Sequence, residues 1–163
     1  MTNDFNGNGA VFSPCESFRY LLWRTWLMGE GTLMFLMLNP STADASKNDP
    51  TVERCQRRAV QLGYRQLIVA NIFAYRSTDR SVLKKLADPV GPDNDDAILH
   101  AARAASKIVC AWGVDGAILQ RSAKVRELLR EFDLWSLKMT AGGEPGHPLY
   151  VEYDVMPDLF QAA

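Results

Sequence analysis

The segment Thr32–Pro40, TLMFLMLNP, restricts the fold more than any other part of the sequence. It is a continuous apolar run that ends abruptly in Asn-Pro. A run that is apolar on both faces is typical of a strand buried in the middle of a sheet. Because proline lacks the N–H that a strand ladder needs, this strand is predicted to end at Pro40. The run is also far shorter than the roughly 20 apolar residues of a membrane-spanning helix.

Further strands and helices are predicted to alternate along the chain. Asp49, Pro50 and Glu53 are typical of a helix start, and Gly63 is typical of a helix end. The other predicted helices are a short one capped by Ser81, one that Asn94 caps and that extends to about Ser106, and one of about sixteen residues after Gly113. The other predicted strands cover residues 18–26 (an early strand or hairpin), 67–73, 107–113 and the weaker segment 134–140.

Strands that alternate with helices predict an α/β fold. We expect a single domain over residues 1–163, built as three α/β/α layers with a mainly parallel central sheet. Residues 1–16 are expected to form a flexible N-terminal segment. The length of 163 residues suits one domain, and the 47% of hydrophobic residues can bury one core.

The net charge and the cysteine pattern limit the ligands and partners that we expect for the protein. Eighteen Lys and Arg against nineteen Asp and Glu give a net charge of −1, which excludes a strongly basic coat for nucleic acid but not a local basic patch. Three widely spaced cysteines and two histidines match no zinc pattern. We therefore expect free thiols, no metal and no cofactor. The sequence shows no export signal, so we expect a cytoplasmic monomer without membrane contact.

Polar residues that follow the predicted strands are the candidates for a site, because ligands bind beyond the carboxyl ends of parallel strands. Asn39 and Asn71 each end a buried strand, and an amide both donates and accepts hydrogen bonds. The alternative is that each amide only caps a turn. Further candidates for substrate binding are Ser41, Thr42, Asp44, Phe73, Tyr75, Arg76 and Trp112. Tyr75 and Arg76 combine a ring for stacking with a charge for phosphate.

His147 is the second candidate catalytic residue, beside Asn39. It lies in GHPLY, where Pro148 favours an extended backbone that holds the imidazole in place. A neutral imidazole donates to a developing oxyanion, and a charged one offsets a leaving anion. The alternative is a structural histidine in a rigid turn. The stretch Arg54, Arg57 and Arg58 suits either a phosphate contact or a solvated helix face.

Six motifs in a fixed order resemble a bacterial and phage family known as domain of unknown function 1643 (DUF1643). They are MLNPSTADA, NDPTVERC, NIFAYRSTD, DPVGPDND, AWG and GHPLY, and the resemblance covers residues 18–153.

The order of the strand-end motifs is also similar, more distantly, to that of the uracil-DNA glycosylase superfamily. There the first motif is GxNPG or GxDPY, a middle strand ends in Asn, a later strand has LWG, and a final loop has HPS. This chain has LMLNPS, VANIF, CAWG and GHPLY. The resemblance implies a uracil-DNA-glycosylase-like fold in which Asn39 positions a water, Asn71 recognises the base edge, and His147 stabilises the departing base. It also implies that Tyr75 or Phe73 stacks a flipped base.

The chain departs from that superfamily at two places. Ser41 stands where the family has glycine, and HPLY lacks the serine and the basic, glycine-rich loop that penetrates a duplex. A free nucleotide, a modified base or single-stranded nucleic acid is therefore as good a substrate candidate as duplex DNA. We expect an enzyme that processes an N-glycosidic bond in nucleic acid or a nucleotide. The alternatives are a non-catalytic nucleotide or nucleic-acid binder and a magnesium-dependent nucleotide hydrolase that uses Asp44 and Asp49.

Overall fold

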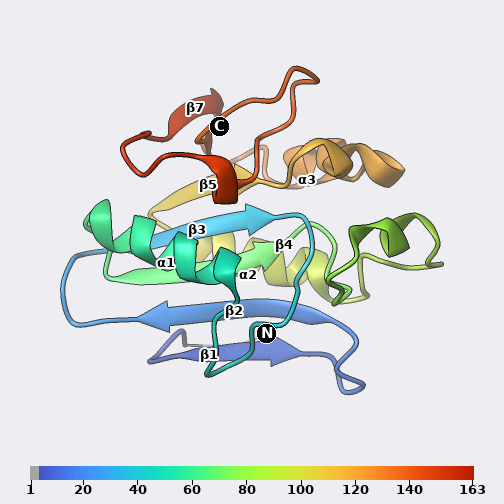
Figure 1. Cartoon of the computed structure of the whole chain (residues 1–163), viewed down its shortest axis with the longest axis horizontal. Helices are drawn as coiled ribbons and strands as arrows, with labels where there is room; N and C mark the ends of the chain where they lie inside the picture. The colour runs from blue at the N-terminus through green and yellow to red at the C-terminus, as the bar shows by residue number, and fades with distance from the viewer. Residues whose placement is uncertain (1–3) are drawn as a thin grey trace.

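The computed structural model describes residues 4–163 and contains a seven-stranded mixed sheet with helices on both faces (Figure 1). The strands are β1 (Gly9–Phe12), β2 (Arg19–Thr25), β3 (Thr32–Met37), β4 (Gln66–Asn71), β5 (Lys107–Ala111), β6 (Leu134–Ser136) and β7 (Asp158–Gln161). Their order in the sheet is β1-β2-β4-β3-β5-β6-β7.

Only the centre of the sheet is parallel. Strands β4, β3, β5 and β6 are parallel to one another, whereas β2 pairs antiparallel with β4, β1 with β2, and β7 with β6. The α/β class is confirmed, but the expectation of a mainly parallel sheet holds only for these four strands. The connection from β1 to β2, residues 13–18, is too short for the crossover that a parallel pair needs.

The α-helices cover the two faces of the sheet. Helix α1 (Pro50–Gln61) packs on one face, and α2 (Asn94–Ala104) and α3 (Arg121–Leu128) pack on the other. Three short 3₁₀ segments complete the structure: η1 (Arg80–Lys84), η2 (Val114–Gln120) and η3 (Pro148–Tyr150). No helix within residues 4–163 is both long and apolar enough to cross a membrane.

Several predicted helix boundaries differ from the structure. Helix α1 begins after the N-cap Asp49, as predicted. The helix expected after Gly113 is instead η2 followed by α3, because Leu119 and Gln120 adopt positive φ angles that interrupt it. Asp79, not Ser81, caps η1. Asn94 is the first residue of α2 and not its cap, since its side chain donates to the carbonyl oxygens of two strand-end residues.

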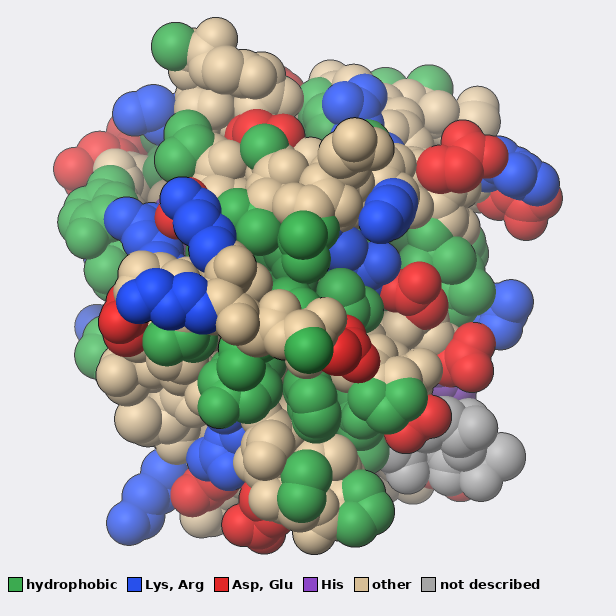
Figure 2. Space-filling model, turned by 90° about the vertical axis from the view of Figure 1, so that its right-hand side faces the viewer, with side chains coloured by type: hydrophobic (Ala, Val, Ile, Leu, Met, Phe, Trp, Pro, Cys, Tyr) green, Lys and Arg blue, Asp and Glu red, His purple; other side chains and the backbone are tan. Residues whose placement is uncertain are grey.

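The parallel strands run in one direction, so their carboxyl ends meet at one end of the molecule. Strands β3 and β4 both point to the right in Figure 1. Figure 2 shows that end: hydrophobic side chains gather near its middle, and acidic and basic side chains lie around them. Neither sign of charge covers this end of the molecule.

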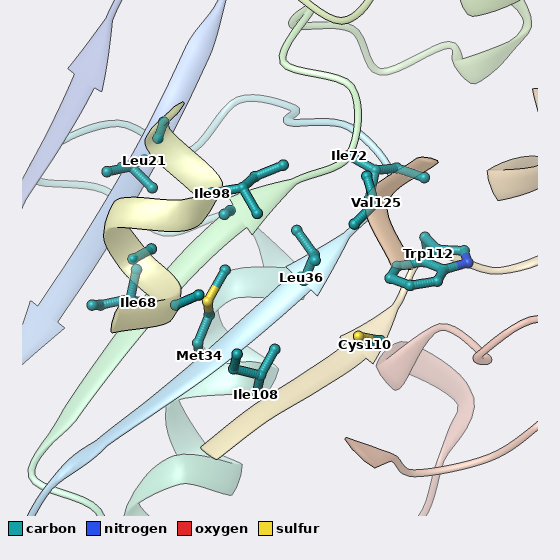
Figure 3. Packing of buried hydrophobic residues seen from close by; sticks show 14 of the residues in the cluster. Leu21, Met34, Leu36, Ile68, Ile72, Ile98, Ile108, Cys110, Trp112 and Val125 are labelled. Carbon is teal, nitrogen blue, oxygen red and sulfur yellow. The ribbon is translucent and has the colours of Figure 1, made fainter. Parts of the chain in front are cut away.

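Alternate residues of the central strand β3 enter two cores. Leu33, Phe35 and Met37 pack toward α1, and Met34 and Leu36 pack toward α2 and α3 (Figure 3). All are buried, which explains why the strand is apolar on both faces. The three cysteines are free, as expected; Cys55 and Cys110 are buried and Cys15 is exposed.

Candidate functional site

A cleft of about 480 Å³ lies at the carboxyl ends of β3, β4 and β5. Its wall includes residues from the segments after β3, β4 and β5, from the start of α1 and from η3. Five of the ten predicted site residues line it: Asn39, Ser41, Asn71, Trp112 and His147. They come from segments far apart in the sequence, and the sheet topology brings them together.

Asn39 is held by the loop that follows β4. Its Nδ2 donates to the carbonyl oxygens of Ser77 at 3.0 Å and Pro40 at 3.2 Å. Among residues 4–163 no donor reaches its Oδ1. The amide is therefore fixed by its nitrogen, and its oxygen is free to accept a hydrogen bond from a water or a ligand.

Whereas Asn39 is held through its amide nitrogen, Asn71, the last residue of β4, is held through its amide oxygen. Its Oδ1 accepts a hydrogen bond from Nη2 of Arg19 at 3.3 Å. Its Nδ2 has no acceptor within the described part of the chain. Because Asn71 is only 1% exposed and lines the cleft, the amide offers its donor to whatever occupies the cleft.

His147 is half-buried and precedes η3. Its Nδ1 accepts a hydrogen bond from the backbone N–H of Leu149 at 3.2 Å. Burial, together with the positive charge of Arg80, lowers the pKa of His147, and the negative charge of Asp49 opposes this shift. The imidazole is therefore neutral at neutral pH, with its proton on Nε2. This arrangement provides a fixed, uncharged donor.

The buried indole of Trp112 forms one wall of the cleft. Its Nε1 donates to Oε2 of Glu144 at 2.6 Å, and the Ser122 hydroxyl donates to Oε1 of the same carboxylate at 2.8 Å. Gly116 packs so closely on the indole that a Cβ there would lie 2.1 Å from a ring carbon. The ring is therefore rigidly placed.

The other five predicted residues lie outside the cleft lining. Thr42 is exposed. Asp44 accepts hydrogen bonds from the backbone of Ser46 and Lys47 in its own loop, which lower its pKa. Phe73 is wholly buried in the core on the α2 side.

The remaining two, Tyr75 and Arg76, follow β4 but pack against the N-terminal segments. The ring of Tyr75 meets that of Phe18 edge to face. The guanidinium of Arg76 lies 4.8 Å from the centre of the Phe12 ring and donates to the carbonyl oxygen of Glu16. Both side chains therefore pack against the N-terminal segments and are held away from the cleft.

Besides five of the ten predicted residues, the cleft contains Asp49, which the sequence suggested only for the magnesium-dependent alternative, and residues that the sequence did not suggest. Arg19 in β2 lines the cleft and is 1% exposed. Asp49 lines the cleft as well as capping α1 through its bond with the N–H of Val52. The polar rim is formed by Thr51, Ser77, Thr78, Asp79, Arg80 and Tyr150. The polar loop after β4 was the available signal for this rim, whereas a buried arginine inside a strand gives no local signal.

Of the α1 arginines, Arg54 and Arg58 serve neither of the two roles considered for them from the sequence, whereas Arg57 lies on a solvated helix face. Arg54 donates to the carbonyl oxygens of Pro148 and Val151, and Arg58 donates to four carbonyl oxygens between residues 151 and 155. They attach the C-terminal segment to α1. Only Arg57 has an exposed side chain, paired with Glu53. Within residues 4–163 no group of three or more His, Cys, Asp or Glu side chains is placed to hold a metal ion.

The sheet and the cleft define an α/β protein with a polar ligand site at the ends of its parallel strands. Residues 19–149 match the model of the family described as "Protein of unknown function (DUF1643)". The chain belongs to this family, as its ordered motifs predicted. No curated protein and no solved structure matches the chain.

Proposed function

We propose that the protein cleaves an N-glycosidic bond, with a base in a nucleotide or in nucleic acid as the leaving group. One observation carries the proposal: Asn39, Asn71 and His147, the three residues that the glycosylase resemblance assigns to the reaction, line the same cleft. We further propose that the fold is of the uracil-DNA-glycosylase type. This is supported by the helices on both sheet faces and by the order of the strand-end motifs.

The chemistry required is modest. The bond between the sugar C1′ and the base nitrogen breaks, and its electron pair stays on the base. The sugar becomes an oxocarbenium-like cation, to which a water adds and from which a proton then goes to solvent. The barrier falls if fixed donors stabilise the negative charge on the base. His147, with Nε2–H free and Nδ1 held by Leu149, supplies such a donor.

Asn39 is suited to positioning the attacking water. Its free Oδ1 accepts a hydrogen bond from a water and fixes its orientation, while Nδ2 is held by the loop. An amide does not deprotonate water effectively, but an oxocarbenium-like carbon needs little activation of the nucleophile. The exposed ring of Tyr150 lies next to His147, with 6.4 Å between ring centres. It offers a surface on which a base stacks.

The surface favours a small or single-stranded substrate over a duplex. Acidic and basic side chains are mixed around the end of the molecule that holds the cleft (Figure 2), and phosphate-rich duplexes bind to continuous basic surfaces. The magnesium-dependent alternative has less support, because Asp44 bonds within its own loop and does not line the cleft with Asp49.

The test is a base-release assay on nucleotides and on single- and double-stranded oligonucleotides that carry uracil or modified pyrimidines. Free base and abasic sites are measured for the wild type, Asn39→Ala, His147→Ala and the control Lys124→Ala. Lys124 is exposed on α3, outside the cleft. We expect each cleft variant to lose about a hundredfold in rate, as removal of one fixed donor does, and the control to keep it.

Two outcomes contradict the proposal. One is a wild type that releases no base from any substrate although it is folded and monodisperse. The other is turnover that survives both cleft substitutions. If nucleotides bind without turnover, the cleft belongs to a non-catalytic binder.

A further inference from the structure

Four arginines in the described strands and helices are buried, and of these Arg19 alone lines the cleft. All four are less than 5% exposed. Arg121 donates to the carbonyl oxygen of Ile72 and is neutralised by an ion pair with Asp95. Arg24 donates through Nε, Nη1 and Nη2 to the Asn48 side chain and four carbonyl oxygens. Arg58 donates to four carbonyl oxygens. Arg19 has only the carbonyl oxygen of Ala43, at 3.0 Å, and Oδ1 of Asn71.

Spare donors therefore remain on Arg19. Its Nε is buried without a hydrogen-bond partner in the described structure, and each Nη has one bond where it has hydrogens for two. No carboxylate within residues 4–163 forms an ion pair with it. Asp49 is close enough to raise the pKa of Arg19, but burial outweighs this and lowers it to about 10. The guanidinium is still charged at neutral pH.

A buried cation with unused donors is unfavourable unless something in the cleft compensates it. Arg24 and Arg58 offset most of this cost through four carbonyl oxygens each. Nε of Arg58 is also buried without a partner in the described structure, but neither of the two arginines lines the cleft. Because Arg19 lines the cleft, acceptors on a molecule bound in the cleft can compensate its charge.

Arg19 also decides what Asn71 presents. Because Nη2 of Arg19 occupies Oδ1 of Asn71, the amide turns its Nδ2 donor to the cleft. Nε2–H of His147 is a donor too, since Nδ1 is occupied by Leu149. The cleft thus combines three donor groups from β2, β4 and the segment before η3.

We propose that Arg19, Asn71 and His147 form a subsite of three donor groups that binds a planar organic anion through its carbonyl-type oxygens. This rests on the proposed function, in which the anion is the departing base. Arg19 then sets specificity. A base whose edge carries an amino group places a hydrogen-bond donor against these protein donors and is rejected, whereas a base with two carbonyl groups places acceptors there and is accepted.

Barbiturate is a suitable probe, because it is a planar pyrimidine with carbonyl oxygens and is an anion at neutral pH. Cytosine has the same ring with an amino group, and inorganic phosphate is an anion without a ring. Calorimetric titration of the full chain with each probe measures affinity and needs no turnover. We expect barbiturate to bind at least tenfold more tightly than either cytosine or phosphate.

Two substitutions probe the subsite, and one serves as a control. Arg19→Met removes the cation. Asn71→Asp keeps the size of the side chain, replaces the free donor with an acceptor, and places a carboxylate against Arg19 that supports folding. We expect either change to weaken barbiturate binding about ten- to a hundredfold, as loss of a charge-assisted hydrogen bond does. The control Arg57→Gln removes an exposed arginine outside the cleft and should change affinity less than about twofold.

The proposal is overturned if barbiturate fails to bind the wild type, if cytosine or phosphate binds as tightly, or if a folded Asn71→Asp variant keeps wild-type affinity. If Arg19→Met does not fold, the Asn71→Asp comparison alone decides. Barbiturate binding without any base release contradicts the proposed function and leaves the subsite standing. Base release without barbiturate binding contradicts the subsite and leaves the proposed function standing.

Discussion

At the scale of single residues, the properties of the site depend on the protonation state of His147. Nδ1 accepts a hydrogen bond from the N–H of Leu149, and this bond exists only while Nδ1 carries no proton. Burial and the charge of Arg80 lower the pKa of the imidazole in the folded chain. The unfolded chain, with an ordinary histidine pKa of about 6.5, therefore takes up a proton first as the pH falls.

The consequence is acid-dependent stability. The contribution of neutral His147 is complete above about pH 6.5 and is lost as the pH falls from there through the lower pKa of the folded state. We expect His147→Gln to weaken this loss, so that its free energy of unfolding falls less than that of the wild type between pH 7 and pH 5. Urea unfolding at several pH values measures this. A His147 pKa at or above its ordinary value, from an NMR titration, would contradict the prediction.

Residue identity alone predicted part of the site. That Asn39 and Asn71 follow buried strands could be inferred, because an apolar run that ends in a polar residue marks a strand end. The burial of Arg19 could not be inferred, because a strand of mixed aromatic and basic residues does not indicate which of its faces turns toward a cleft. Phe73 and Tyr75 lie only two and four residues beyond Asn71, yet the path of the chain directs one into the core and the other toward Phe18.

At the scale of elements, the start of α1 connects stability to the cleft. Oδ1 of Asp49 accepts from the N–H of Val52 at 2.9 Å, and Oδ2 accepts from Ala43 at 3.4 Å. We expect Asp49→Ala to lower the free energy of unfolding by about 1 kcal/mol, the usual cost of a lost N-cap. Asp49→Asn keeps a capping oxygen and should lose only a small part of this. Chemical denaturation measures both, and equal stability of Asp49→Ala and the wild type would show that the cap is dispensable.

Elements with local signals were predictable, and elements without them were not. Helix α1 has a cap, a proline and a terminal glycine in sequence, so its limits follow from the chain itself. The break between η2 and α3 depends on positive φ angles at Leu119 and Gln120. Residues of these types rarely adopt that conformation, so the sequence predicted one continuous helix. Strand β7 is short and mostly exposed at the sheet edge, and its pattern is too weak to detect.

At the scale of the whole molecule, the sequence predicted the α/β class but not the antiparallel edges. The alternation of strands and helices between β3 and β6 determines the parallel centre. The antiparallel strands do not follow this alternation. β1 pairs with the next strand, β2, whereas β2 pairs with β4 instead of β3, and β7 pairs with β6 across the long connection 137–157. Pairing between such distant segments is not encoded in any local pattern. The C-terminal segment that carries the histidine is likewise held by residues nearly one hundred positions earlier in the chain.

That attachment leads to a final prediction, about Arg54. Its Nε and Nη2 donate to Pro148 at 3.1 Å and Val151 at 2.7 Å, directly after His147, and its guanidinium lies 4.4 Å from the centre of the Tyr153 ring. Arg54→Ala removes two hydrogen bonds worth about 1 kcal/mol each. We therefore expect amide hydrogen exchange over residues 147–153 to become about tenfold faster or more.

The matched control is Arg57→Ala, three residues along the same helix. Arg57 pairs only with Glu53, and its side chain is 68% exposed, so its loss should leave exchange in residues 147–153 unchanged. If both variants behave alike, α1 does not hold the segment, and the position of His147 must be determined within its own loop. If only Arg54→Ala accelerates exchange, and base release falls with it, then a helix on one face of the sheet positions a side chain in the cleft at its end.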